Sequence, residues 1–367
     1  MKLCLVILLV AGSTFAQQTA TLDETARFLA GLPVEGALAP LMQTPAWQQH
    51  AREMDTAWAK KETHQIFPIR EWMSINAGPY FLSTETMYYM FAGPDFLYAH
   101  TFFPFANTYI LAGLEPIGQV GDLTTFPPEA VTGNLSILRA SLASILRFQY
   151  FITKDMRAEL GKNGVSGVLP LLYVFLARTH NTLLEVERVT FPAEGVKLVF
   201  HAPQREQNRT LFYFKTDLSG GNSAFLKWCG TQGPGLSLLK AASFLLHGEG
   251  FNGVRNFLLE NSRVIIQDDS GIPLRAFPKG WNVQCFGPYV PHRTEFAKYT
   301  QPELLALSQR NPNSPLGFAF GYHWQKEEGM LMLATPTGSE QAPNMPPVMK
   351  ALPVAPEEQA QEARVRK

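Results

Sequence analysis

Four acidic residues stand in settings where a carboxylate could do acid or base chemistry. Asp95 follows a Gly-Pro turn among aromatic residues, and Glu115 ends an apolar segment before a proline. Asp268 and Asp269 adjoin each other just after a segment of strand character. A buried or paired carboxylate can have its pKa shifted into the range in which it exchanges protons at neutral pH. His100, five residues after Asp95, completes the set of candidate catalytic residues.

Each of these acids also has a structural interpretation. Asp95 can accept a hydrogen bond within its turn or cap a helix that begins at Phe96. Glu115 can form an ion pair at a strand end. Asp268 and Asp269 fit a turn, and neighbouring residues of an extended segment point to opposite faces, so we do not expect them to share a proton. We expect most of the four acids to accept hydrogen bonds from nearby backbone groups.

Motifs that would identify a cofactor or a metal do not occur in the sequence. The eight histidines include no His-x-x-x-His or His-Glu-x-x-His pair, and there is no Cys-x-x-Cys. No segment, including the one around Ser166, matches the serine nucleophile pattern G-x-S-x-G. The glycines of residues 230–235 fit neither a phosphate-binding nor a dinucleotide-binding loop. We therefore expect no cofactor and no metal site.

The first sixteen residues have the layout of a secretory signal peptide. Lys2 precedes an apolar run over residues 3–10, and small residues follow up to Ala16. The run is shorter than the roughly 20 apolar residues that span a bilayer, so a cleaved signal fits better than an anchor. A buried N-terminal helix is the alternative. We expect cleavage after Ala16 and an exported, soluble protein, periplasmic or secreted, that begins at Gln17.

Two cysteines, Cys229 and Cys285, follow the predicted signal peptide. In an oxidising compartment they can form a disulfide, and closing a loop of about 56 residues would stabilise the fold by roughly 4 kcal/mol. Two buried thiols are the alternative. We expect the disulfide.

The composition indicates a large folded body followed by a tail. Hydrophobic residues make up 46% of the chain and charged residues 17%, so residues 17–335 can bury a large core. The 31 basic and 31 acidic residues form no basic stripe, so we expect no nucleic-acid partner. Residues 336–367 are rich in proline and lack aromatic residues, and we expect them to be disordered.

Hydrophobic periodicity predicts groups of helices and groups of strands. The predicted helices begin after Thr21, Thr44 and Thr300 or cover residues 128–146, 168–178, 237–247 and 254–261. Strand character occurs at residues 108–114, 184–191, 196–201, 210–217 and 263–267, and residues 316–324 and 330–334 read as a hairpin. Helices and strands do not alternate regularly. We therefore expect an α+β fold, an antiparallel β-meander and hairpins packed with several helices, with a subdomain boundary near 165–183 as an option.

Three segments resemble a family of exported bacterial proteins of unknown function. They are GPDFLY at residues 93–98, YILAGLEP at residues 109–116 and QDDSGIP at residues 267–273. The resemblance implies an envelope or secreted location, and it assigns no catalytic residue.

Two classes of function fit the sequence. The dense aromatic residues of 86–103 favour a non-catalytic protein that binds a ligand or an envelope partner through an aromatic-lined surface. The alternative is a hydrolase-like enzyme that uses carboxylates as acid and base. The two differ in geometry, because a catalytic acid must stand in a water-accessible concavity beside a second polar group.

Overall fold

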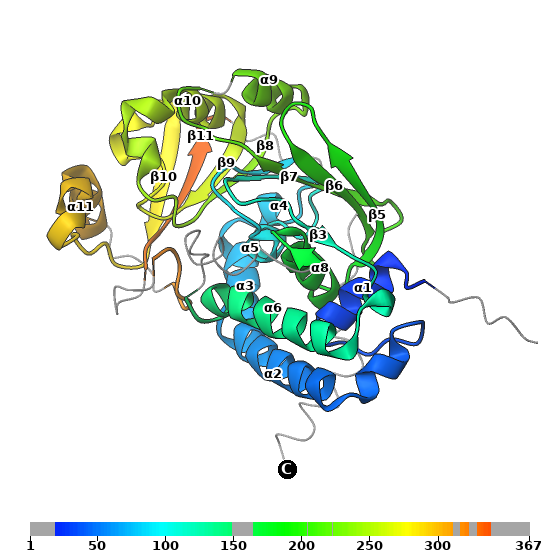
Figure 1. Ribbon diagram of the computed structural model, residues 1–367. Helices are drawn as coiled ribbons and strands as arrows, with labels where there is room; N and C mark the ends of the chain where they lie inside the picture. Colours follow the sequence, from blue (N-terminus) through cyan, green and yellow to red (C-terminus); the bar gives the residue numbers. More distant parts are fainter. Residues whose placement is uncertain are drawn as a thin grey trace, which may run out of the picture.

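The computed structural model describes residues 19–148, 164–203, 205–221, 223–310, 316–322 and 329–338. The predicted signal peptide lies outside these residues, as do residues 339–367 of the tail predicted at 336–367, whereas Pro336 ends a strand. The described residues form a three-layer arrangement in which helices cover both faces of one large sheet (Figure 1).

Within the described ranges the sheet has nine strands in the order β10-β11-β9-β8-β1-β2-β7-β6-β5. Five parallel strands form its centre: β9 (Ser262–Gln267), β8 (Gly235–Leu239), β1 (Met87–Tyr89), β2 (Thr108–Gly113) and β7 (Arg209–Lys215). Antiparallel strands complete both edges: β6 (Gly195–His201) and β5 (Thr182–Val189) beyond β7, and β11 (Leu331–Pro336) and β10 (Trp281–Phe286) beyond β9. A separate small sheet pairs β3 (Gln119–Val120) with β4 (Val165–Ser166).

The predicted α+β class is wrong, because a parallel centre with helices on both faces is an α/β fold. The predicted meander does exist as β5, β6 and β7, but it is only one edge of the sheet. Strands buried on both faces carry continuous apolar runs instead of alternation, and such runs resemble buried helices. For this reason residues 237–247, predicted as a helix, instead contain most of β8 and a 3-10 turn.

The predicted hairpin near the C-terminus is also wrong. Residues 316–322 contain no strand, and β11 pairs with β10 on one side and β9 on the other. The optional subdomain boundary is predicted near residues 165–183. Strand β2, which precedes these residues in the chain, and strand β7, which follows them, pair within the same sheet.

In the part of the chain that the structure describes, six helices lie on one side of the sheet and build the larger hydrophobic core: α1 (Leu22–Leu29), α2 (Pro45–Lys61), α3 (Phe67–Asn76), α5 (Phe96–Phe102), α6 (Pro128–Phe148) and α8 (Leu169–Arg178). On the other face lie α9 (Ser223–Thr231) and α10 (Asn252–Asn261) (Figure 1). The other helical segments among the described residues are η1 (Ala39–Gln43), η2 (Glu62–Ile66), α4 (Gly78–Phe81), η3 (Leu123–Thr125), η4 (Leu245–His247), η5 (Glu249–Phe251), η6 (Leu274–Ala276), η7 (Thr294–Tyr299) and α11 (Pro302–Arg310).

Local sequence explains both the layers and the helix starts. Side chains alternate across β1, so that Tyr89 packs in the larger core and Tyr88 in the smaller one. The Thr21 hydroxyl accepts a hydrogen bond from the amide of Glu24 at 3.1 Å, and Thr44 caps the amide of Trp47 at 3.3 Å. Both predicted helix starts are therefore confirmed.

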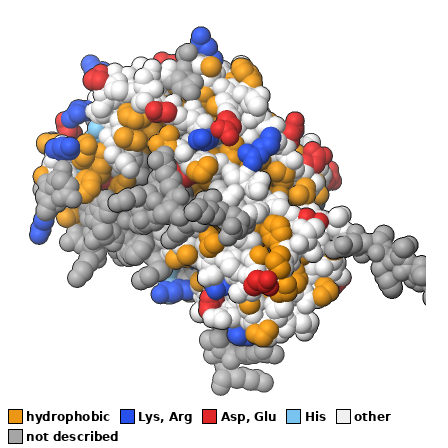
Figure 2. All heavy atoms as spheres, viewed as in Figure 1, with side chains coloured by type: hydrophobic (Ala, Val, Ile, Leu, Met, Phe, Trp, Pro, Cys, Tyr) orange, Lys and Arg blue, Asp and Glu red, His pale blue; other side chains and the backbone are white. Residues whose placement is uncertain are grey.

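The surface carries interspersed charges. On the face shown in Figure 2, basic and acidic side chains are mixed with hydrophobic ones, and no stripe of one sign stands out. Among the residues that the structure describes, no helix has the length and apolar character needed to cross a bilayer.

Candidate functional site

A cavity of about 750 Å³ lies where the carboxyl ends of the parallel strands meet. Most of its lining comes from the ends of β1, β2, β7 and β8 and the segments that directly follow them, and Phe251, Phe296 and Tyr322 complete it. Open parallel sheets bind ligands at this edge, because loops from adjacent strands converge there. The volume also lies in the range of about 300–1,000 Å³ that is typical of small-molecule sites.

The cavity combines an apolar mouth with a charged floor. Leu114 and Leu245 are 48% and 37% exposed, and partly buried aromatic side chains stand beside them. Buried beneath are the charged side chains Asp95, Glu115 and Lys240. The full lining is Tyr89, Met90, Phe91, Ala92, Gly93, Asp95, Gly113, Leu114, Glu115, Thr216, Asp217, Leu218, Lys240, Ala241, Ala242, Ser243, Leu245, Phe251, Phe296 and Tyr322.

Asp95 is both a helix cap and half of a buried ion pair. Its Oδ1 accepts a hydrogen bond from the amide of Tyr98 at 3.1 Å, which confirms the predicted cap of the helix that begins at Phe96. Its Oδ2 lies 3.0 Å from Nζ of Lys240 and accepts a hydrogen bond from the Tyr89 hydroxyl at 3.1 Å. Both carboxylate oxygens are therefore engaged by the protein.

Two lysines lie near the ring of Tyr98. Nζ of Lys240 is 3.6 Å from the ring centroid, and Nζ of Lys61 is 5.9 Å from it. Burial lowers the pKa of Lys240, and the neighbouring carboxylate of Asp95 opposes this shift. The pKa of Lys61 is lowered to about 7, first by burial and then by repulsion from Lys240. The buried ionisable side chains of Asp95, Lys240 and Lys61 therefore lie close together beside the cavity floor.

Glu115 occupies a space that Gly113 leaves open. It directly follows β2, and its Oε2 accepts a hydrogen bond from the hydroxyl of Tyr213 at 3.2 Å. A Cβ on Gly113 would overlap Oε2 of Glu115 and lie 2.9 Å from the Cα of Gly93. Only glycine at position 113 therefore lets the carboxylate lie against the cavity floor at this point.

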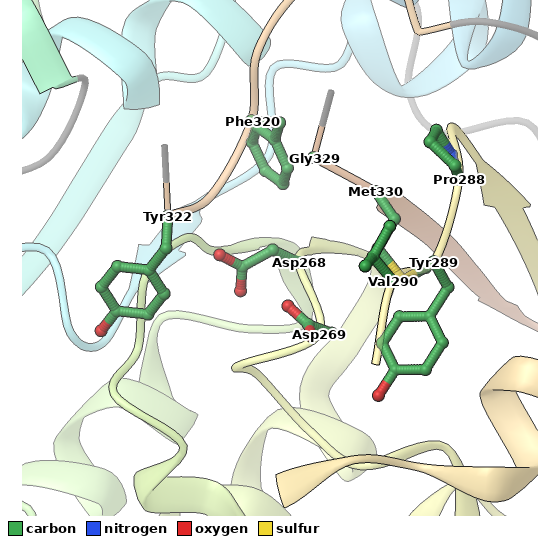
Figure 3. A pocket seen from close by; sticks show the side chains of 9 residues that line it. All are labelled: Asp268, Asp269, Pro288, Tyr289, Val290, Phe320, Tyr322, Gly329 and Met330. Atoms are coloured by element: carbon green, nitrogen blue, oxygen red, sulfur yellow. The ribbon is translucent and has the colours of Figure 1, made fainter. Parts of the chain in front are cut away.

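Asp268 and Asp269 line a second, much smaller cavity of about 20 Å³, enough for a single water molecule (Figure 3). We expected their side chains to point to opposite faces, but both lie in this one cavity. Strand β9 ends at Gln267 and the chain turns, with the amide of Gly271 donating to the carbonyl of Asp268 at 3.3 Å. Alternation holds only within an extended strand, so it does not apply here.

The two acids have different partners. Asp268 accepts hydrogen bonds from the amide and hydroxyl of Ser270 at 3.0 and 2.5 Å, as predicted for a turn acid, and also from the amide of Ala241 at 2.8 Å. Burial, followed by repulsion from Asp269, raises the pKa of Asp268 to about 7. Oδ2 of Asp269 lies 2.6 Å from Nε2 of His292. Sequence reasoning did not identify His292 as part of this site.

The segment after β8 lines the larger cavity, is hydrogen bonded to Asp268 of the smaller one, and has an unusual backbone. Ala241, Ser243 and Phe244 have φ angles of 52°, 56° and 57°, in the left-handed region that residues other than glycine rarely adopt. Side chains hold this segment in place: Asp268 binds the amide of Ala241, and the hydroxyl of Tyr322 accepts from the amide of Ser243 at 2.9 Å. Tyr322 lines both cavities. Backbone strain of this kind concentrates at ligand sites.

Comparisons with protein-family models, with curated proteins and with solved structures each found no match to this chain. The resemblance to exported bacterial proteins therefore stays a prediction, and the site must be interpreted from its own geometry.

His100 is separate from the cavity at the sheet edge. It is buried beside Arg209 and Asn181, whose side-chain nitrogens lie 3.4 and 3.5 Å from its Nε2. Burial and the nearby guanidinium of Arg209 lower its pKa well below the usual value. Neither cavity described above is lined by His100, so the structure does not bring it together with the acids.

Cys229 and Cys285 are free thiols in the structure and belong to different hydrophobic clusters. The disulfide between them remains a prediction. Within the described ranges, no three His, Cys, Asp or Glu side chains are grouped so that they could hold a metal ion.

Proposed function

We propose that the protein binds a small organic ligand in the cavity at the carboxyl ends of β1, β2, β7 and β8. The observation that carries this proposal is the cavity itself, with its volume of about 750 Å³ and its exposed apolar mouth above buried charges. Exposed apolar side chains around a concave site favour ligand binding, because the ligand removes them from water. Residues 89–95 of the aromatic-rich segment contribute one wall.

Binding without catalysis fits the state of the acids. Asp95 and Asp268 are each only 2% exposed, and both accept several hydrogen bonds from the protein. A carboxylate that is engaged in this way holds the structure of the site and has little capacity left for a substrate proton.

A screen of fragment-sized compounds by ligand-observed NMR tests the proposal. Leu245 at the cavity mouth is 37% exposed, and Leu184 on β5, outside the cavity, is 40% exposed, so the two form a matched pair. Leu245→Trp should obstruct the mouth and weaken binding by about tenfold or more, whereas Leu184→Trp should have no effect. Compounds that bind equally well to both variants, or a screen without any binder, would contradict the proposal.

A hydrolase-like function is the second candidate, and the pKa of Asp268 favours it. A carboxyl group that titrates near pH 7 can act as acid or base at neutral pH, and Asp268 adjoins the strained segment at Ala241. Under this alternative, wild-type protein should convert a bound compound, and Asp268→Asn should abolish conversion while binding persists. Binding without conversion in the wild type would favour the first proposal.

We also propose export, on the order of charge, apolar run and small residues in positions 1–16 and on the resemblance to exported proteins. Mass spectrometry of periplasmic or secreted protein should find Gln17 at the N-terminus. An intact Met1 in exported material would contradict cleavage.

A further inference from the structure

We propose that the cavity at the carboxyl ends of β1, β2, β7 and β8 takes an uncharged, largely apolar compound, such as a small aromatic alcohol, in preference to an organic ion. This inference rests on the ligand binding proposed above and specifies the chemical class of the ligand.

Apolar side chains provide most of the lining that water reaches. Leu114 and Leu245 are 48% and 37% exposed, and Phe91, Phe251 and Phe296 are partly buried. A ligand that covers these side chains removes them from water, and its own apolar surface leaves water at the same time. The accessible part of the cavity therefore favours a ligand with a large apolar surface.

The charged side chains at the cavity floor are buried and are engaged by the protein itself. Oδ2 of Asp95 lies 3.0 Å from Nζ of Lys240, and Oδ1 accepts from the amide of Tyr98 at 3.1 Å. Glu115 accepts from the hydroxyl of Tyr213 at 3.2 Å. Asp95, Lys240 and Glu115 are each 2–3% exposed. An ionic ligand would have to compete with these contacts, and an ion that gives up its water without an equivalent partner binds weakly.

Asp217 is the one charged lining residue, among those that the structure describes, that is open to solvent. Its Oδ1 accepts a hydrogen bond from the amide of Ser219 at 2.8 Å. Water and salt screen an ion pair with an exposed carboxylate, so such a pair contributes little to affinity. Asp217 therefore gives a cation little advantage over an uncharged ligand.

Aromatic rings from several segments suit a ligand that carries a ring of its own. Phe91 and Phe251 form an edge-to-face pair with centroids 5.9 Å apart. Phe296 and Tyr322 line the same cavity, and the ring of Phe244 packs against both, with centroids 6.0 and 6.2 Å away. Edge-to-face and stacked contacts with such rings favour an aromatic compound over an aliphatic one of equal size.

Three probes that share one ring system and one substitution position test the inference: naphthylmethanol, naphthylmethylammonium and naphthoate. In isothermal titration calorimetry at neutral pH, we expect the alcohol to bind at least tenfold more tightly than either ion. Its affinity should change by less than about twofold between low and high salt. Benzyl alcohol, which has one ring fewer, should bind about tenfold more weakly than naphthylmethanol, because it covers less apolar surface.

Two pairs of measurements locate the effect in the cavity. Leu114→Asn should weaken the binding of naphthylmethanol about fivefold or more, whereas Leu184→Asn on β5, outside the cavity, is the control and should have no effect. Asp217→Asn should change the affinity of the alcohol and of the ammonium by less than about twofold. Thermal unfolding of each variant checks that it folds.

The possible outcomes separate this inference from the proposed function. If either ion binds at least as tightly as the alcohol and Leu245→Trp weakens that binding, the uncharged class is overturned while ligand binding stands. A tenfold loss of ammonium affinity in Asp217→Asn, or equal affinity of Leu114→Asn and wild type for the alcohol, would also overturn it.

The fragment screen decides the case in which no naphthyl probe binds. Charged compounds among the tightest binders would overturn the inference, and uncharged ones would support it. A screen without any binder contradicts both proposals. Should Leu114→Asn not fold, the order of affinities and their salt dependence in the wild type still decide the question.

Discussion

Replacing Asp95 by Asn should destabilise the protein far more than the loss of a helix cap would. Weakening a cap costs about 0.5–2 kcal/mol. Here the change also removes the ion-pair partner of Lys240, and both side chains of this pair are at most 3% exposed. Breaking a buried pair by removing one member costs roughly 3–5 kcal/mol, because the other charge keeps its cost of burial. We therefore expect a loss of about 3–5 kcal/mol for Asp95→Asn.

Urea unfolding of the wild type, Asp95→Asn, Lys240→Met and the double variant measures this effect as a double-mutant cycle. The double variant should be less destabilised than the sum of the single variants by about 2 kcal/mol or more, since neither charge is then left behind. The exposed pair Lys215 and Glu194, 3.7 Å apart, is the matched control and should couple by less than about 1 kcal/mol. A loss below about 1 kcal/mol for Asp95→Asn, or additive single effects, would refute the reasoning.

Three further predictions concern buried charges and the glycine that accommodates Glu115. The pKa of Asp268 is raised from 3.8 to about 7 in the folded protein, so its contribution to stability is present below about pH 4 and is lost as the pH rises to about 7. Asp268→Asn should flatten this part of the profile of unfolding free energy against pH. An unchanged slope would contradict the prediction. The pKa of Lys61 is lowered from 10.5 to about 7, so the unfolding free energy should rise between about pH 7 and 10. Lys61→Met should remove that rise and stabilise the protein near pH 6. A variant that is destabilised at pH 6 would contradict this and show that the protein compensates the buried ammonium well. Gly113→Ala should lower the free energy of unfolding, measured by heat or urea, by about 1–3 kcal/mol, because the added Cβ would overlap Glu115. Gly133→Ala in α6 is the control and should be neutral or stabilising, because an added Cβ there meets open space. Equal effects of the two substitutions would refute the overlap.

Local signals in the sequence predicted the elements that depend on local contacts. The caps at Thr21 and Thr44 and the short polar connections of the β5-β6-β7 meander are formed by residues close in sequence, and these predictions are confirmed. Pairing between β1 and β8 joins residues about 150 positions apart, and the sequence of neither strand indicates which strand it pairs with. The three-residue β1 is too short to show any period, so the parallel centre could not be predicted.

The same limit applied to the candidate site. Asp95 was identifiable because its Gly-Pro turn and the helix after it are local. Lys240 was missed because residues 237–247 were interpreted as a helix, in which it would be one polar position among several. As a strand, the segment ends at Leu239, and a lysine directly after a buried parallel strand would have been a strong signal for the site. The closeness of Asp268 and Asp269 depended on where β9 ends.

The place of β11 in the sheet has a consequence for how the chain folds. β11 covers residues 331–336 and lies between β9 and β10. The backbone groups of β9 and β10 that face β11 therefore have no hydrogen-bond partner in this strand until the ribosome has added some fifty residues after β10. Until β11 joins, β9 is an open parallel edge and β10 has no neighbour in the sheet. A chain that stops before residue 331 should therefore remain only partly folded and prone to association through these edges, so the native sheet can form only after β11 has been synthesised.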